Sequence, residues 1–200
     1  MSGARLLLVR HGRTAWNRER FLGRADVPLD DVGRAQARTV AAALGDDALD
    51  RLWCSPLQRA VATAQPLAER SGLVPSVRPE LSELDCGTWQ GQLKSDPSAK
   101  ISKRDPELAI PGGESIADAW RRVAVFLQQV GGELHDGTSV VVGHYLVNQL
   151  LAAQLLGLPL DRALRSAAYR PAPGSVLELV LHDGTWHSEG FRVTALAGLR

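Results

Sequence analysis

The sequence has very little cysteine, which excludes a scaffold held together by disulfide bonds. Cys54 and Cys86 are the only two cysteines in 200 residues, and they also lack the paired spacing of a zinc site. We therefore expect both side chains to be small buried hydrophobic groups.

Long apolar segments and an excess of charge of one sign are missing as well. Early in the chain the longest apolar run is Leu6 to Val9, far short of the ~20 residues of a membrane-spanning helix or the ~7–15 of a secretory signal. The 23 Lys and Arg residues against 22 Asp and Glu give a net charge of +1, which removes the global electrostatic argument for nucleic acid or an anionic membrane. We expect a cytoplasmic protein with no nucleic-acid partner and no membrane partner.

Several widespread motifs of nucleotide and ester chemistry do not occur. There is no Gly-x-x-x-x-Gly-Lys-Ser/Thr loop, no Gly-x-Gly-x-x-Gly and no Gly-x-Ser-x-Gly elbow. Four residues separate Cys54 from Arg59, one fewer than in the Cys-x5-Arg loop that wraps a phosphate around a thiolate. The sequence therefore argues against P-loop, dinucleotide-binding, α/β-hydrolase and cysteine-phosphatase chemistry.

What is present is typical of an ordinary globular domain, with 44% hydrophobic and 22% charged residues. Apolar periodicity predicts strands at 5–9, 52–54, 75–78, 138–142, 176–181 and 186–193, and helices at 30–44, 55–70, 116–130 and 146–156. The alternation predicts an α/β fold, a three-layer sandwich with a mostly parallel central sheet and an antiparallel hairpin at one edge. We expect one domain over residues 1–200, with the polar segment 84–115 as a lid or insertion.

Local signals set the expected ends of these elements. Ser55, Pro56 and Gln58 fit an N-cap, a first helical position and a capping box. Asp183 and Gly184 suit the tight turn of the hairpin.

Two histidines follow directly after predicted strands. His11 comes after the first strand and His144 after the strand at 138–142. Because ligands of such sheets bind outside the carboxyl ends of the strands, these two side chains could face each other there.

The residues around both histidines belong to a longer ordered pattern. It comprises Leu8 to Asn17, Phe21 to Leu29 with Gly33 and Gln36-Ala37, Ser55 to Ala60, Glu83 to Gly91, Pro111 to Ser115, and Val142 to His144. This pattern resembles the histidine phosphatase superfamily, which includes the cofactor-dependent phosphoglycerate mutases, and it covers most of residues 5–156.

The resemblance implies a phosphomonoester hydrolase that acts through a phosphohistidine at His11. A neutral imidazole, with a reference pKa of about 6.5, is a good nucleophile for a phosphoryl group. Arg10 and Arg59 would clamp the nonbridging phosphate oxygens, and His144 would donate a hydrogen bond to the phosphoryl group from the opposite wall.

A carboxylic acid is needed to protonate the leaving oxygen, and the resemblance assigns this role to Glu83. Glu80 and Asp85 are close competitors in the sequence. The spacing from Glu83 to the Gly87-x-Trp89-x-Gly91 stretch favours Glu83.

Further residues are expected to bind phosphate or substrate. Asn17, and the backbone at Gly23 and Arg24, would complete these contacts, and Tyr145 either walls off one side of the pocket or packs against the following helix. Arg13, Arg18, Arg20 and Arg24 crowd the two segments that rim the site, where they either select an anionic metabolite or form a solvated face.

We expect no cofactor and no metal, since His135, His182 and His187 have no carboxylate or cysteine placed to complete a ligand set. The partner is a small phosphomonoester, and the sequence is also compatible with a homodimer.

Two alternative functions remain, a 2,3-bisphosphoglycerate-dependent phosphoglycerate mutase and a noncatalytic phospho-ligand binding module. Arg13 stands where the mutases carry glutamate, and the segment from Glu83 to Pro111 is shorter than in the glycolytic mutases; both features favour hydrolysis.

Overall fold

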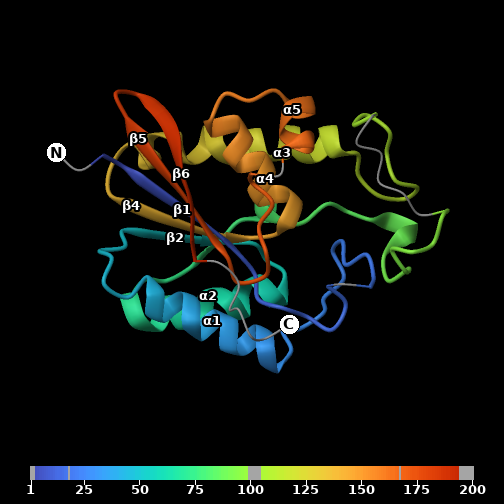
Figure 1. Ribbon diagram of the computed structural model, residues 1–200, viewed down its shortest axis with the longest axis horizontal. Helices are drawn as coiled ribbons and strands as arrows, with labels where there is room; N and C mark the ends of the chain where they lie inside the picture. The colour runs from blue at the N-terminus through green and yellow to red at the C-terminus, as the bar shows by residue number, and fades with distance from the viewer. Residues whose placement is uncertain (1–2, 18, 99–104, 167, 194–200) are drawn as a thin grey trace.

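A central sheet with the strand order β3-β2-β4-β1-β5-β6 organises the protein (Figure 1). The computed structural model describes residues 3–17, 19–98, 105–166 and 168–193. The parallel strands are β1 (Arg5–Arg10), β2 (Arg51–Cys54), β3 (Ser76–Val77) and β4 (Thr138–Gly143). The edge hairpin, β5 (Val176–His182) and β6 (Thr185–Val193), pairs antiparallel to β1. The expectation of a mostly parallel sheet with an antiparallel edge is confirmed.

Helices cover both faces of the sheet, which gives the expected three layers. One face carries α1 (Asp31–Ala43) and α2 (Gln58–Ser71), and the other carries α3 (Ile116–Val130), α4 (Tyr145–Leu155) and α5 (Leu160–Arg165) (Figure 1). No described helix has both the length and the apolar character needed to span a membrane. Short 3-10 helices lie at Pro79–Leu81, Gly87–Trp89 and Gly131–His135.

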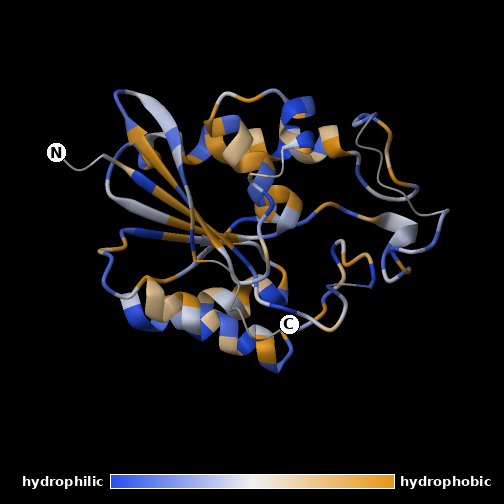
Figure 2. Ribbon diagram, in the orientation of Figure 1, coloured by the Kyte–Doolittle hydropathy of each residue, from blue (hydrophilic) through white to orange (hydrophobic). Residues whose placement is uncertain are grey.

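The alternation of side chains along β1 builds two hydrophobic cores. Leu6 and Leu8 pack on the side of α3 and α4, whereas Leu7 and Val9 pack on the side of α1 and α2. All four are fully buried, and the central strands are the most continuously apolar part of the ribbon (Figure 2).

Most local predictions hold, and the start of α2 is the main error. Asp183 and Gly184 have positive φ angles of 48° and 74°, as the tight turn requires. In contrast, α2 begins at Gln58 with Leu57 as its N-cap and with no capping side chain. The Ser55 hydroxyl lies instead within hydrogen-bonding distance of His144, so the capping box predicted for this helix is wrong. The short helix α5 was not expected.

The loop after β1 and the segment around residue 90 lie side by side beyond the carboxyl ends of the parallel strands (Figure 1). Phe21 donates its N–H to the Gln92 carbonyl, and Gly91 donates to the Phe21 carbonyl. The loop also approaches α1 closely, since a Cβ atom on Gly12 would lie 2.4 Å from the Gly33 oxygen. Within the segment 84–115, residues 99–104 lie outside the described part of the chain, and its role as a lid of a single domain stays a prediction.

Candidate active site

The sheet topology brings His11 and His144 together. Arg10 and Gly143 are register partners at the ends of the parallel strands β1 and β4, so the next residue of each strand is a histidine. The His11 N–H donates to the Gly143 carbonyl at 3.0 Å, and the two imidazole centroids are 5.1 Å apart. The two histidines therefore meet where the sequence pattern predicted.

The hydrogen bond of His11 fixes its tautomer. Its Nδ1 lies 2.7 Å from the Gly12 carbonyl oxygen, which can only accept, so Nδ1 carries the proton. The lone pair of the neutral ring is then on Nε2. His11 lines the pocket and thus presents a nucleophilic nitrogen there.

Both imidazoles are held neutral by their surroundings. Burial lowers the pKa of His11 well below its usual value, and the Arg10 and Arg59 charges lower it further. Burial likewise lowers the pKa of His144, with smaller contributions from Arg59, His11 and Arg10. Neither ring loses its lone pair to protonation near neutral pH.

His144 is fully buried beside His11 and is not among the described lining residues of the pocket. Its Nε2 lies 2.7 Å from the Ser55 hydroxyl, and that oxygen also accepts the Leu57 N–H at 3.3 Å. The Ser55 hydroxyl can donate to Nε2 or accept from it, and the Nδ1 of His144 is buried without a partner among the described residues. When the hydroxyl donates to Nε2, the proton of the neutral ring is on Nδ1, which is then a donor without a protein partner among these residues.

Arg10 and Arg59 line the same pocket with part of each guanidinium uncommitted. Arg10 donates from Nη1 to the Pro171 carbonyl at 2.8 Å and lies over the Tyr145 ring at 5.2 Å. Burial lowers the pKa of Arg10 to about 10, so it stays cationic at neutral pH.

Arg59 is held from α2 by the backbone of the opposite loop. It is fully buried and donates to the Ala25 carbonyl at 2.7 Å and the Gly23 carbonyl at 2.8 Å. The Nε atoms of Arg59 and Arg10 are buried with no hydrogen-bond partner among the described residues. Two fixed cations with free donors are what a doubly charged oxyanion needs.

Glu83 is the carboxyl group placed in the pocket wall, whereas Glu80 and Asp85 are not among its lining residues. Glu83 accepts from the backbone N–H groups of Leu84 at 3.0 Å and Leu146 at 3.3 Å, so its side chain is anchored from two segments. The structure thus favours Glu83 over both competitors on position.

An ion-pair network fixes the chain on either side of Glu83. Arg122 donates to the Glu80 and Ser82 carbonyls at 2.6 and 2.8 Å, and its Nε and Nη2 donate to the two carboxylate oxygens of Glu114, each at 2.9 Å. Glu114 also accepts the Asp85 N–H at 3.0 Å. This forked pair from α3 therefore supports the segment that carries Glu83.

The structure brings three of the four predicted substrate-binding residues to the pocket, namely Asn17, Gly23 and Tyr145. The Asn17 Oδ1 accepts from the Thr14 N–H and hydroxyl at 2.6 and 3.0 Å, which leaves its amide N–H groups for a ligand. Arg24 is not part of the lining: its N–H donates to Gln90 at 3.0 Å and its side chain contacts Glu114.

The arginines expected at the rim have protein partners. Arg13 pairs with Asp30 at 2.8 Å, Arg20 donates to the Gly91 carbonyl at 2.7 Å, and Arg24 pairs with Glu114 at 3.2 Å and Asp85 at 3.5 Å. Arg18 lies outside the described residues.

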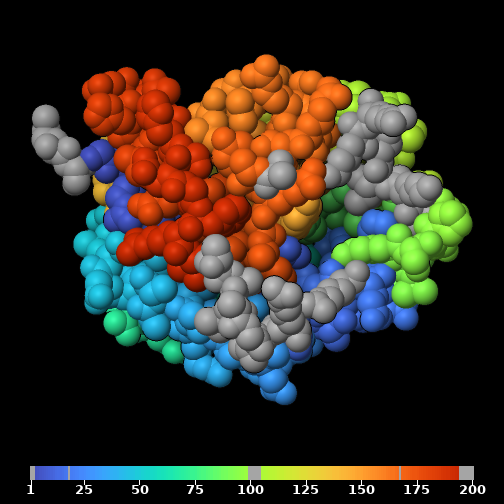
Figure 3. Space-filling view, viewed as in Figure 1, coloured from blue at the N-terminus to red at the C-terminus, as the bar shows by residue number. Residues whose placement is uncertain are grey.

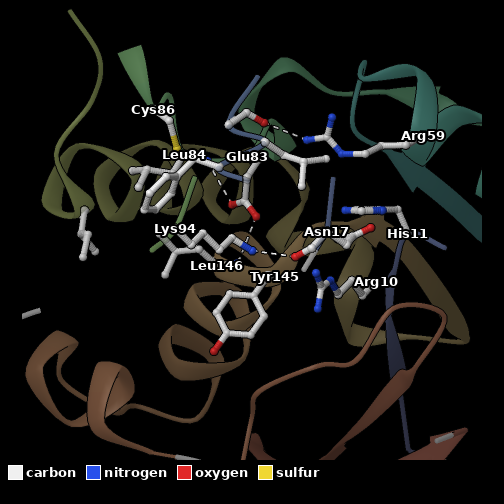
Figure 4. A pocket seen from close by; sticks show the side chains of 14 residues that line it. Arg10, His11, Asn17, Arg59, Glu83, Leu84, Cys86, Lys94, Tyr145 and Leu146 are labelled. Carbon is white, nitrogen blue, oxygen red and sulfur yellow. Dashed lines mark hydrogen bonds between the residues drawn. The ribbon is translucent and has the colours of Figure 1, made fainter. Parts of the chain in front are cut away.

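The predicted site residues that line the pocket enclose, with their neighbours, a volume of about 320 Å³ at the carboxyl ends of the strands. Its described lining residues are Arg10, His11, Asn17, Phe21, Leu22, Gly23, Arg59, Glu83, Leu84, Cys86, Lys94, Ile116, Tyr145 and Leu146 (Figure 4). The surface is hollowed where the blue, green and orange parts of the chain meet (Figure 3).

Gln36 and Thr63 support the loop that carries His11, and the sequence predicted no role for either residue. Both hold the backbone beside His11: Thr63 accepts the Gly12 N–H at 3.1 Å, and Gln36 accepts the Arg13 N–H at 2.8 Å. Gln36 belongs to the ordered family pattern, so the sequence did mark this position. Its role depends on how the loop after β1 folds, and that loop is distant from Gln36 in the sequence.

Both cysteines are free and buried, as expected. Burial raises the pKa of Cys54 to about 11 and that of Cys86 to about 12, so neither thiol is a ready nucleophile. Within the described part of the chain, no group of three or more His, Cys, Asp or Glu residues is arranged to hold a metal ion.

Comparison with known proteins agrees with this site. The sequence profile of the histidine phosphatase superfamily (branch 1) matches residues 6–194. Phosphoserine phosphatase 1 of Hydrogenobacter thermophilus is 32% identical over 166 residues, covering 79% of both chains. Glucosyl-3-phosphoglycerate phosphatase of Mycolicibacterium vanbaalenii is 36% identical over 171 residues, covering 78% of this chain and 76% of the relative. The native structure of a mycobacterial glucosyl-3-phosphoglycerate phosphatase superposes with a TM-score of 0.82 at 31% identity, covering 94% of this chain and 98% of the other.

The chain belongs to the histidine phosphatase superfamily. The family and the α/β architecture predicted from the sequence are confirmed, and so is the expectation of an enzyme of the phosphatase class.

The buried neutral histidines predict how stability depends on pH. A histidine whose pKa is lowered by folding takes up its proton more readily in the unfolded chain, so the free energy of unfolding falls as pH drops below ~6.5. Between pH 7.5 and 5.5 each such histidine contributes a loss on the order of 1 kcal/mol. Urea unfolding of His11→Gln should show a pH dependence smaller by that amount. The exposed His187→Gln is the control, and an unchanged pH dependence in His11→Gln would contradict burial of a neutral imidazole.

Proposed function

We propose that this protein hydrolyses a phosphomonoester through a phosphohistidine formed on His11. One observation carries the proposal: His11, whose Nε2 keeps the lone pair, lines a pocket together with Arg10 and Arg59, and the Nε of each arginine has no partner among the described residues. The proposed nucleophile and the two cations that would bind the phosphate oxygens therefore share one pocket.

In the first step, Nε2 of His11 forms a bond to phosphorus as the ester P–O bond breaks. The leaving oxygen takes a proton from the Glu83 carboxyl group and departs as an alcohol. In the second step, water gives a proton back to Glu83 and its oxygen attacks phosphorus, which breaks the P–N bond and releases inorganic phosphate. Each step leaves Glu83 ready for the next.

The remaining groups stabilise charge on the three nonbridging oxygens. Arg10 and Arg59 provide fixed cations, the Nδ1–H of His144 provides a donor, and the amide of Asn17 provides another. In a loose transition state the charge spreads over these oxygens, so preorganised donors contribute most there. These groups supply positive charge from the chain itself, so the proposal includes no cofactor and no metal.

The substrate is a small phosphorylated metabolite. The relatives named above are phosphatases for phosphoserine and glucosyl-3-phosphoglycerate by their names, both small phosphomonoesters. We extend that class to this chain and keep Gly23 and Tyr145 as pocket-lining contacts. The segment 84–115 supplies Leu84, Cys86 and Lys94 to the wall, in line with a covering role.

A trapped intermediate tests the proposal. The protein is mixed with labelled p-nitrophenyl phosphate in buffer containing EDTA, and the reaction is quenched rapidly without acid. This should give a phosphoenzyme that is stable in base and labile in acid. His11→Ala should form none and should retain its fold by circular dichroism, because a methyl group cannot carry the phosphoryl group. His187→Ala, on the exposed strand β6, serves as the control. An acid-stable adduct, or a label retained by His11→Ala, would refute the mechanism.

The role of Glu83 predicts a dependence on the leaving group. Glu83→Gln keeps the shape and removes the transferable proton, so phosphorylation by an alkyl phosphate should slow by ~10²–10⁴-fold. Phosphorylation by p-nitrophenyl phosphate should slow much less, since p-nitrophenolate departs without a proton. Single-turnover rates are the measurement, because Glu83 also acts in the second step.

Asp85→Asn is the matched control for this experiment. Asp85 is two positions away and lies outside the pocket lining, so the ratio of the two phosphorylation rates should stay at its wild-type value. Equal losses for both esters in Glu83→Gln would remove Glu83 from the acid role, and an ester-dependent loss in Asp85→Asn would assign it to Asp85.

A further inference from the structure

The pocket has a second side that the phosphate chemistry does not use. Figure 4 shows Arg10, His11 and Arg59 on one side, Leu84 and Cys86 on the other, and Glu83 between them. Five apolar side chains line the pocket besides Cys86, and we call them the apolar wall: Phe21, Leu22, Leu84, Ile116 and Leu146. Because Glu83 lies between the two sides, the wall is where the alcohol part of an ester would lie.

The apolar wall is fixed in position. Leu84, Ile116 and Leu146 are 2%, 3% and 7% exposed and belong to the core that packs beneath α3 and α4. Phe21 packs against Trp89, with ring centroids 6.1 Å apart. These four side chains are therefore held in place by the packing of the core.

The backbone of the apolar wall also offers few hydrogen bonds. The N–H of Phe21 donates to the Gln92 carbonyl at 3.0 Å, and those of Leu84 and Leu146 donate to Glu83. A ligand hydroxyl placed here would give up its bonds to water without finding replacements from these groups.

The described pocket lining also contains few cationic side chains. Arg13, Arg20 and Arg24 are held by the protein partners given above and are absent from the described lining. Apart from Arg10 and Arg59, Lys94 is the one lysine or arginine among the described lining residues, and its ammonium group donates to the Asn17 carbonyl at 2.6 Å. Among the described lining residues, Lys94 is thus the one lysine or arginine left to receive a further anionic group.

We propose that the substrate carries a compact apolar group, a branched alkyl or an aromatic ring, next to its phosphate, with at most one other anionic group, which Lys94 receives. This inference rests on the proposed phosphatase function and narrows its substrate class. A pocket of about 320 Å³ is at the small end for ligand sites, which agrees with a compact group. A hydroxyl-rich sugar phosphate is the disfavoured class.

Two esters of similar size test the inference, 3-methylbutyl phosphate and glycerol 3-phosphate. Glycerol is the slightly better leaving group, so leaving-group chemistry opposes the expected preference. We expect kcat/KM for the methylbutyl ester to be at least ~10-fold higher, since each buried methylene contributes about fourfold. Phosphoenzyme formation from p-nitrophenyl phosphate is measured in parallel.

Leu22→Asn probes the wall directly. Leu22 is half-buried and is not a member of either buried core, so the variant is expected to fold. The variant should bring the ratio of kcat/KM for 3-methylbutyl phosphate to that for glycerol 3-phosphate within ~3-fold of one, because an amide replaces one apolar contact. Leu108→Asn, at a 61% exposed leucine outside the described lining, should keep the wild-type preference. If Leu22→Asn loses its fold, Leu22→Ala takes its place.

The outcomes separate the two claims. A wild-type ratio near or below one, with the phosphoenzyme still formed, overturns the apolar substrate class and leaves the phosphatase function standing. A preference that survives both Leu22 variants overturns the assignment to this wall. Absence of a phosphoenzyme with every ester overturns the proposed function and this inference with it.

Discussion

The hydrogen bond from His11 Nδ1 to the Gly12 carbonyl is the contact on which the site depends. It decides which ring nitrogen keeps the lone pair, and the surrounding chain is arranged to hold that carbonyl still. Thr63 on α2 accepts the N–H of Gly12 and Gln36 on α1 accepts the N–H of Arg13, so both helices of one layer hold the same backbone. Gly33 allows the approach, because a Cβ there would lie 2.0 Å from the Arg13 oxygen.

Burial gives the rest of the site its chemistry. Ordinarily two histidines beside two arginines would be exposed to water and screened from each other. Here desolvation and the cations favour the neutral imidazoles, while the arginines remain charged because their intrinsic pKa is so high. The result is a neutral imidazole in a positive field, which is what the proposed attack on an anionic ester requires. The apolar wall then completes the pocket on the side where no charge develops.

Much of this arrangement could be predicted from sequence, because strand ends and motif order are local signals. His11 and His144 each follow an apolar run, and the parallel pairing of those runs is what a βαβ pattern implies. Ser55 shows the limit: its local signal favours an N-cap, but the fold places a histidine from residue 144 beside it, and that bond replaces the cap. Arg24 shows the same limit, because its partners Asp85 and Glu114 lie far along the chain. Residue spacing in the sequence does not predict which charged side chains pair between distant loops.

The position of the phosphoryl group on the His11 ring tests this account most directly. Phosphoenzyme prepared with ¹⁵N-labelled histidine can be denatured in base and examined by ³¹P and ¹⁵N NMR, which distinguish phosphorus on Nε2 from phosphorus on Nδ1. The hydrogen bond to Gly12 predicts phosphorus on Nε2 of one histidine, with Nδ1 unmodified. Phosphorus on Nδ1, or on His144, would contradict the tautomer and with it the organisation of the site described above.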